Sequence, residues 1–171
     1  IEINISAESP EEAARMFYQK YKRDDDCKVK VDWKVFTLAE LFPEKKVVKF
    51  ELRKSNTEAR ENALHLDCCF QPLGKGKAII HKNGFLVEEE YQFLVELFGK
   101  ENIFEISKEE MYQMTSNVFS ISEEVIVSEQ NFTRLNTWLR AIGFVVEEIP
   151  FAEISKQEGL LRCSTLPLAR S

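Results

Sequence analysis

The chain has 171 residues, of which 44% are hydrophobic and 30% are charged, and its formal net charge is -6. This length suffices for one domain with a buried core, and the acidic balance argues against a nucleic-acid-binding surface of clustered Lys and Arg. No apolar run approaches the roughly 20 residues of a membrane span, and no charged-then-apolar leader opens the sequence. We therefore expect a cytoplasmic globular protein that binds neither nucleic acid nor membrane.

The four cysteines and two histidines set further expectations. The cysteines have neither the spacing of a metal site nor that of a disulfide framework, and two histidines are too few to complete a zinc site. Reduced thiols are the default for such a chain. We expect no metal and no cofactor.

Residues 1–36 are expected to form a small β-α-β element of their own. Residues 1–5 alternate as a strand does, and Pro10 begins a helix that continues to Tyr21. Charged and apolar residues then alternate over 28–36, which predicts a half-buried strand.

Residues 37–171 are assigned to a second domain. Its first segments predict a short helix at 37–43 that ends at a proline, an apolar strand at 46–52 and a polar loop at 55–62. An extended run at 64–70 follows the loop. It contains one of the two histidines.

From residue 65 the chain repeats its pattern, with an offset of roughly 43 to 50 residues. The first unit has strands at 65–71 and 77–81, a helix at 87–98 and a strand at 103–106. The second has strands at 117–121 and 125–128, a helix at 131–142 and a strand at 145–149. Gly99 and Gly143 follow the helices, where a left-handed C-cap is needed. Residues 163–168 would open a third unit. The predicted fold class is α/β (α+β), with repeated ββαβ modules.

Three polar residues precede or begin the first strand of successive units. Asp67, Asn117 and Cys163 would therefore point toward a common centre. Cys163 follows Arg162 at the expected start of a strand, and a neighbouring cation favours a thiolate. His65 lies two residues before Asp67, so a strand would place both side chains on one face. A nucleophile, a base and a carboxylate are then available.

Two stretches of sequence resemble a known superfamily. Residues 63–70 (ALHLDCCF) and 159–167 (GLLRCSTLP) are similar to the His-x-Asp and terminal-Cys motifs of the guanidine-modifying enzymes, which comprise amidinotransferases, arginine deiminases and dimethylarginine hydrolases. The resemblance runs from about residue 37 to 171 and is closest to amidinotransferases. It implies a pentein-type α/β propeller with a pseudo-fivefold arrangement, of which this sequence accounts for about half a ring.

The resemblance also implies roles for the residues. Cys163 would form a covalent amidino intermediate on an arginine-type guanidine substrate, and His65 would protonate the leaving amine and later activate the incoming nucleophile. Asp67 would accept hydrogen bonds from the guanidinium group. Ser116 and Asn117 match a Ser/Asn pair near the substrate, although ordinary turn residues before a strand explain them equally well. Water as the second nucleophile gives a hydrolase and an amine gives a transferase; the sequence leaves both open.

The sequence also departs from the superfamily pattern. A Gly-Gly-Asp-type run should precede the histidine, but the first glycine in this sequence is Gly74. Either N-terminal modules are missing from a longer enzyme, or the element at 1–36 replaces them. Open sheet edges in a half ring favour association with another chain or a homo-oligomer. The alternative function is a catalytically incomplete module that serves as a binding scaffold. A cysteine protease fits less well, because Cys163 follows the histidine and Pro167 prevents a helix after it.

Each candidate residue has a purely structural explanation beside the functional one. Taken alone, Cys163 in an apolar strand would be an inert buried thiol, and His65 an ordinary histidine. Cys68 and Cys69 are expected to be core residues. His81, at a strand end, is expected to be exposed.

Overall fold

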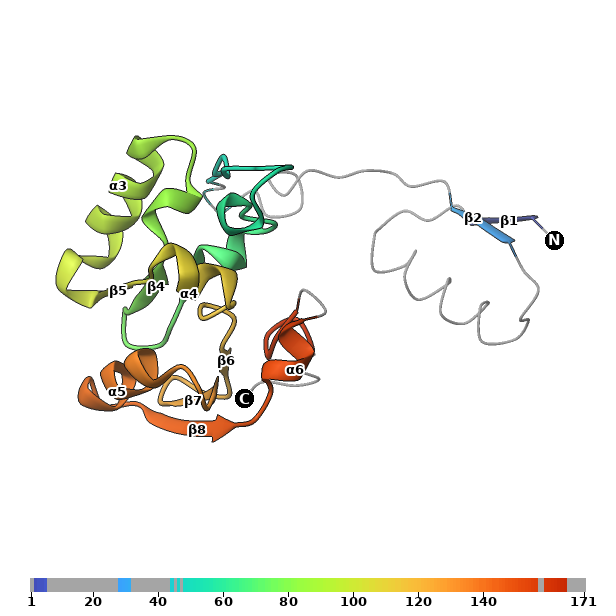
Figure 1. Ribbon diagram of the computed structural model, residues 1–171. Helices are drawn as coiled ribbons and strands as arrows, with labels where there is room; N and C mark the ends of the chain where they lie inside the picture. Colours follow the sequence, from blue (N-terminus) through green and yellow to red (C-terminus); the bar gives the residue numbers. More distant parts are fainter. Residues whose placement is uncertain are drawn as a thin grey trace. The chain divides into compact units, whose positions relative to one another are not determined.

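The computed structural model describes residues 2–5, 28–31, 44, 46, 48–156 and 159–165. The chain folds as two compact units, Ile1–Val48 and Lys49–Ser171. Each unit is considered by itself (Figure 1). None of the helices in the described part of the chain is long and apolar enough to cross a membrane.

In the first unit, two short strands pair in parallel. Strand β1 (Glu2–Ile5) lies beside β2 (Lys28–Val31), with Glu2 opposite Lys28. Parallel neighbours need a crossover connection, as the expected β-α-β element would supply. The helices predicted to start at Pro10 and to span 37–43 lie outside the described residues.

The first ββαβ module belongs to the second unit. Its elements are β3 (Phe70–Pro72), β4 (Ala78–Ile80), α3 (Glu88–Phe98) and β5 (Ile103–Glu105). Strand β4 is central; it pairs antiparallel with β3 and parallel with β5. The turn between β3 and β4 has positive φ at Lys75 (59°) and Gly76 (66°). All three β4 residues are buried, as befits a central strand under a helix.

The second module repeats this topology. Its elements are β6 (Phe119–Ser120), β7 (Val125–Glu129), α5 (Thr133–Ala141) and β8 (Val145–Ile149). Strand β7 pairs antiparallel with β6 and parallel with β8. In Figure 1, α3 lies beside β4 and β5, and α5 lies beside β7 and β8. Two consecutive ββαβ modules are therefore present as predicted; their place in a pseudo-fivefold ring stays a prediction.

The two modules end their helices in the same way. Gly99 follows α3 with φ 79°, and Gly143 follows shortly after α5 with φ 88°. L-residues with a Cβ rarely adopt such φ values, so glycine is required where each chain turns back into its parallel strand.

Two hydrophobic clusters hold the second unit together. The smaller contains first-module and preceding residues, among them Ala63, Ile80 and Leu94. The larger spans both modules and includes Leu139 of α5 and Leu160 near the end of the described chain. The segment that bears Cys163 is thus anchored by apolar packing close to the thiol.

Short helices fill the connections. They are η1 (Ala59–Glu61), η2 (Leu66–Cys68), η3 (Lys82–Gly84), η4 (Lys100–Asn102), α4 (Lys108–Tyr112) and α6 (Ala152–Ser155). Helix α4 was not predicted. It begins with a capping box, in which Ser107 and Glu110 each bond the other's backbone N–H.

Two predictions about this unit, apart from those for the segments of Asp67 and Cys163, are wrong. Residues 48–52 form no strand; only an isolated bridge joins Leu52 to Phe85. His81 is buried rather than exposed, with 4% of its surface accessible. Its Nδ1 lies 2.9 Å from the Ile106 carbonyl oxygen, and that hydrogen bond offsets the cost of burying the ring.

Candidate active site

Asp67 lies in a 3-10 turn rather than in a strand. His65 is the N-cap of η2, with φ -135° and ψ 168°. The Cys68 N–H donates to the His65 carbonyl (3.1 Å), and the Cys69 N–H donates to the Leu66 carbonyl (3.0 Å). These bonds form a 3-10 turn, in which successive side chains do not alternate between two faces as they do in a strand. The expectation that His65 and Asp67 share one face of a strand is therefore wrong.

Ser116 stabilises this turn from the second module. Its hydroxyl lies 2.7 Å from the Asp67 carbonyl oxygen and 2.9 Å from that of Cys68, and its residue has no accessible surface. Both carbonyls would otherwise be left without a strand partner. A side chain about 50 positions later in the sequence thus fixes the backbone at Asp67.

Cys163 also lies in a turn and not at the start of a strand. Residues 161–164 form the turn, in which the Ser164 N–H donates to the Leu160 carbonyl (3.0 Å). The Cys163 N–H donates to Asn117 Oδ1 (3.3 Å), so this donor is unavailable to a sheet. Cys163 is exposed. Most of the expected third module, from 166 onward, lies outside the described residues.

The structure brings three predicted side chains together. The Cys163 Sγ atom lies 3.0 Å from Asn117 Nδ2 and 3.7 Å from Asp67 Oδ2. Asn117 Nδ2 lies 3.4 Å from the same Asp67 oxygen. Asp67 is half-buried and has no ion pair with any residue that the structure describes. A carboxylate in this state can accept a cationic group beside the thiol.

His65 stands apart from this contact group. It is exposed, and its ring makes no hydrogen bond within the described segments. The backbone of His65 is nevertheless continuous with η2, two residues before Asp67. The structure therefore places the histidine next to the site in sequence but does not join it to the thiol.

The remaining described cysteines differ from Cys163 in their surroundings. Cys68 and Cys69 are buried core residues, as predicted. Burial raises the pKa of the Cys68 thiol and raises that of the Cys69 thiol to about 12. Both thiols therefore stay protonated and unreactive near neutral pH, so among the described cysteines Cys163 is the candidate nucleophile.

A compact loop, residues 53–63, precedes His65. The Ala63 N–H closes it by donating to the Arg53 carbonyl (3.0 Å). The Lys54 ammonium then donates to the Ala63 and Leu64 carbonyls, at 2.5 Å each. The loop thus fixes the backbone up to the residue before His65.

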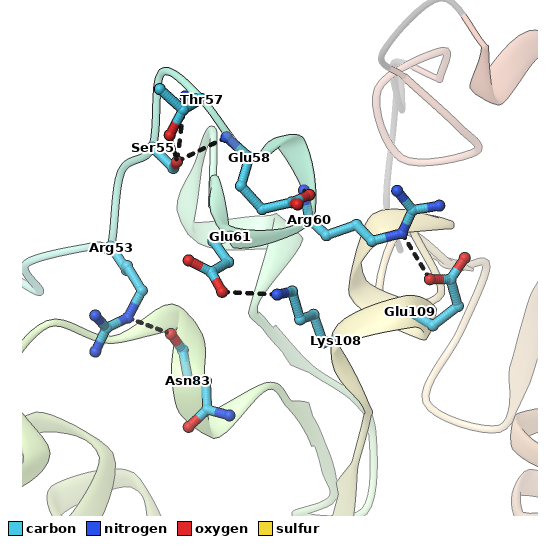
Figure 2. Close-up of polar contacts among 9 residues, drawn as sticks. All are labelled: Arg53, Ser55, Thr57, Glu58, Arg60, Glu61, Asn83, Lys108 and Glu109. Atoms are coloured by element: carbon cyan, nitrogen blue, oxygen red, sulfur yellow. Dashed lines mark hydrogen bonds and ion pairs between the residues drawn. The ribbon is translucent and has the colours of Figure 1, made fainter.

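Ion pairs fasten this loop to α4 (Figure 2). Arg60 Nε lies 2.8 Å from Glu109 Oε2, and Lys108 Nζ lies 2.7 Å from Glu61 Oε1. The Lys108 ammonium holds the pKa of Glu61 below its ordinary value. All four side chains are about half exposed, so water and salt weaken both pairs and each contributes little to stability.

A cavity of about 430 Å³ lies beside the same loop and helix. Asn62, Tyr112 and Lys156 are among its lining residues, and Cys68 reaches it from η2. Neither Asp67 nor Cys163 lines it. The cavity is therefore a neighbour of the three-residue contact and not the same feature. No group of three or more possible metal ligands occurs among the described residues.

Comparisons with known proteins give the family of the chain and the fold that it shares. Residues 85–170, about half of the chain, match the family described as arginine deiminase. The chain belongs to the arginine deiminase family. The matched region contains Ser116, Asn117 and Cys163, whereas His65 and Asp67 precede it.

One curated relative of this arginine deiminase family chain is YkgA of Bacillus subtilis (strain 168), described as uncharacterized. It is 30% identical over 133 residues, which are 78% of this chain and 43% of YkgA. The chain thus spans less than half of that relative.

Solved structures share the fold. The N-terminal domain of ArgZ, an arginine dihydrolase from cyanobacteria, superposes with a TM-score of 0.65 at 17% identity, over 96% of this chain and 69% of that one. SxtG, an amidinotransferase from Microseira wollei, gives a TM-score of 0.50 at 16% identity, over 99% of this chain and 42% of SxtG. At these identities the likeness shows a common fold.

Two features of the site were missed from the sequence. Nothing in the sequence indicates that Lys54 holds the backbone before His65. Its partners are backbone carbonyl groups, which every residue type carries. The full burial of Asn117 was also missed. A buried position could have been inferred from the apolar residues that follow it, but the partners of its carboxamide could not.

Proposed function

We propose that this chain is the thiol-bearing part of an enzyme that attacks the guanidine group of arginine or a related compound. The observation that supports it best is the convergence of Cys163, Asn117 and Asp67 from three separate segments. A thiol beside an unpaired carboxylate suits a planar cation whose carbon must be attacked by a soft nucleophile. The same convergence counts against a purely structural module.

The covalent step uses the exposed thiol. In this proposal the Cys163 thiolate adds to the guanidinium carbon while the Asp67 carboxylate accepts hydrogen bonds from the guanidinium nitrogens. The carbon–nitrogen bond to the leaving amine breaks as the His65 imidazolium transfers its proton to that nitrogen. An amidino thioether on Cys163 and a neutral imidazole remain.

The second step releases the group. Neutral His65 takes a proton from the incoming nucleophile, which attacks the same carbon, and the carbon–sulfur bond breaks to restore the thiolate. Water gives hydrolysis, and an amine gives transfer. ArgZ is an arginine dihydrolase and SxtG an amidinotransferase, so the fold is found with both outcomes.

Solved structures of ArgZ support a covalent route. Its N-terminal domain is known with product, with substrate in a cysteine-to-serine variant, and, in a further variant, covalently bonded to a reaction intermediate. We propose that Cys163 forms a covalent intermediate of this kind. Because the chain spans 43% of YkgA, we further propose that another part of the protein or a second copy supplies the groups that complete the guanidinium site. We keep residues 1–36 as a separate element. We also propose that the protein is cytoplasmic, because a reducing compartment would suit a catalytic thiol.

Matched alkylating reagents test the proposal without full turnover. 2-Chloroacetamidine carries an amidinium cation, whereas 2-chloroacetamide is neutral and of similar size. The alkylation rate of Cys163 with each reagent is divided by the rate of a simple thiol with the same reagent. The resulting value should be about tenfold larger for the cation, because Asp67 attracts it in a partly desolvated site. Mass spectrometry of the Cys163 peptide measures both rates.

Variants decide what causes the preference. Asp67→Asn should remove it, and Cys163→Ala should remove the labelling itself. Glu109→Gln, which changes an exposed carboxylate that pairs with Arg60, is the matched control and should leave the preference intact. A normalised ratio near one in the unaltered chain would overturn the proposal.

A further inference from the structure

Every polar atom of the Asn117 side chain has an internal partner. Its Oδ1 accepts from the backbone N–H groups of Arg162 (3.0 Å) and Cys163 (3.3 Å). Its Nδ2 lies 3.0 Å from Cys163 Sγ and 3.4 Å from Asp67 Oδ2. A carboxamide offers two acceptor sites and two N–H groups, so all of its capacity is used.

The orientation of this carboxamide follows from its partners. Backbone N–H groups only donate, so the atom that faces Arg162 and Cys163 must be the oxygen. The amide nitrogen must then face the thiol and the carboxylate. Asn117 is also fully buried, with 0% of its surface accessible. These facts leave it no free group with which to bind a substrate.

We propose that Asn117 is the positioning residue of the nucleophile: its oxygen fixes the backbone of Arg162 and Cys163, and its N–H group solvates the Cys163 thiolate. This inference rests on the proposed role of Cys163 as the attacking thiol. It replaces the substrate-binding role that the sequence suggested for Asn117.

Donation from Asn117 Nδ2 would stabilise a thiolate that lies beside a carboxylate. Two titratable groups of η2 face Cys163: the Asp67 carboxylate, 3.7 Å from the sulfur, and the buried Cys68 thiol. A thiolate would be repelled by the carboxylate. Asn117 Nδ2 lies close to both atoms and carries two N–H groups, so it can donate one to each, and hydrogen bonds to charged acceptors are stronger than neutral ones. Donation from Asn117 to both atoms would offset the repulsion between the carboxylate and the thiolate.

Ser116 has a different task, although it adjoins Asn117. Its hydroxyl contacts the Asp67 and Cys68 carbonyls. It therefore acts on the backbone of η2, whereas Asn117 acts on the reacting atoms. A purely structural role for Asn117 would predict loss of stability without any change in thiol chemistry, which makes the two roles separable.

The test is the pH dependence of Cys163 alkylation by iodoacetamide, a neutral reagent, followed on the Cys163 peptide by mass spectrometry. Asn117→Asp keeps an oxygen for both backbone N–H groups but removes the donor and adds charge. Its alkylation midpoint should rise by about one pH unit or more, with a roughly tenfold slower rate at neutral pH. Asn117→Ser, which retains a smaller neutral donor, should shift the midpoint less in the same direction.

The matched control is Asn136→Asp. Asn136 is also buried, at 1% exposure, and its Nδ2 donates to the Glu129 carbonyl (3.0 Å), away from Cys163. This variant should lower the free energy of unfolding yet leave the alkylation midpoint unchanged. Equal midpoints for Asn117→Asp, Asn117→Ser and the unaltered chain would overturn the inference.

A measurement on the unaltered chain covers the case in which the variants do not fold. The side-chain amide ¹⁵N and ¹H resonances of Asn117 should shift with the same midpoint as Cys163 alkylation, and Cys163→Ala should abolish that shift. Resonances that stay constant across the midpoint would also overturn the inference. Because iodoacetamide is neutral, a failure of the guanidine proposal would appear only with the amidinium reagent.

Discussion

The two ββαβ modules present different side chains at the same point, just before the first strand. The first module offers Asp67, a half-buried carboxylate without an ion-pair partner in the described residues. The second offers Asn117, a buried carboxamide with every polar atom in use. In our proposals, the residue before the first strand contacts a cation in one module and supports the nucleophile in the other.

The modules also differ in how they are packed. The cluster around α3 draws on the first module and the chain before it, whereas the cluster around α5 spans both modules and includes Leu160 and Leu161. The second module therefore links the first one to the thiol-bearing turn. Three pairs of substitutions test how the modules are held together.

The largest effect is expected from truncating a core leucine. Leu94 of α3 and Leu139 of α5 are almost fully buried, and such Leu→Ala changes cost about 3 to 5 kcal/mol of unfolding free energy. Leu139→Ala should lie at the upper end, because its cluster joins both modules, and Leu94→Ala at the lower end. Urea unfolding of the two variants measures the costs; a larger loss for Leu94→Ala would contradict the comparison.

An intermediate effect is expected where the hairpins of the two modules meet. A Cβ added at Gly74 would lie 2.2 Å from the Glu123 carbonyl oxygen, so Gly74→Ala should force the two turns apart and cost about 2 to 3 kcal/mol. At Gly76 a Cβ meets nothing within 4 Å, and only its φ of +66° is unfavourable.

Gly76→Ala is therefore the control, with an expected cost of about 1 kcal/mol. Thermal unfolding of both variants gives the ranking. If Gly76→Ala lowered the unfolding temperature as much as Gly74→Ala, close packing of Gly74 against Glu123 would not be important for stability.

The smallest effect concerns an ion pair between the second module and α4, the helix in the connection that precedes it. The Arg134 guanidinium of α5 holds the pKa of Glu110 in α4 below its ordinary value, with help from Ser107 and against partial burial. A carboxyl whose folded pKa is lowered stabilises the fold above its unfolded pKa of about 4.3, and this contribution disappears as the pH falls through the folded value.

Glu110→Gln should therefore cost about 1 kcal/mol at pH 7, because an uncharged oxygen accepts more weakly from Arg134 and from the Ser107 N–H, and less below pH 4. Glu109→Gln, at an exposed neighbour, should cost less at pH 7. Urea unfolding at both pH values tests this; a loss for Glu110→Gln that is the same at low pH would show that its charge is not responsible.

Local sequence patterns predicted the module framework well. Strand β8 was predicted to the residue, and the bounds of α3 and α5 to within two residues, because apolar periodicity and the following glycines are local signals. Helix α4 also had a local signal, the Ser107-to-Glu110 spacing of a capping box, which was overlooked.

The residues that meet at the site were predicted, but the backbone conformation around them was not. The repeat pattern singled out Asp67, Asn117 and Cys163, and these side chains do meet. The strands expected at Asp67 and Cys163 are turns, because Ser116 and Asn117 take up backbone groups from segments 45 to 49 positions away. No local pattern encodes such partners, and the same reason explains the unexpected burial of His81 against Ile106.

The separation of these partners also has a consequence for the order of folding. Asp67 and Cys163 are 96 positions apart, and Asn117 is 50 positions from the first and 46 from the second. Contacts so distant in sequence form only after the loop-closure entropy of the intervening chain has been overcome, whereas each ββαβ module is built from nearer neighbours. We infer that the modules fold first and that the thiol joins the carboxylate late, so a partly folded chain holds Cys163 without the groups proposed to control its reactivity.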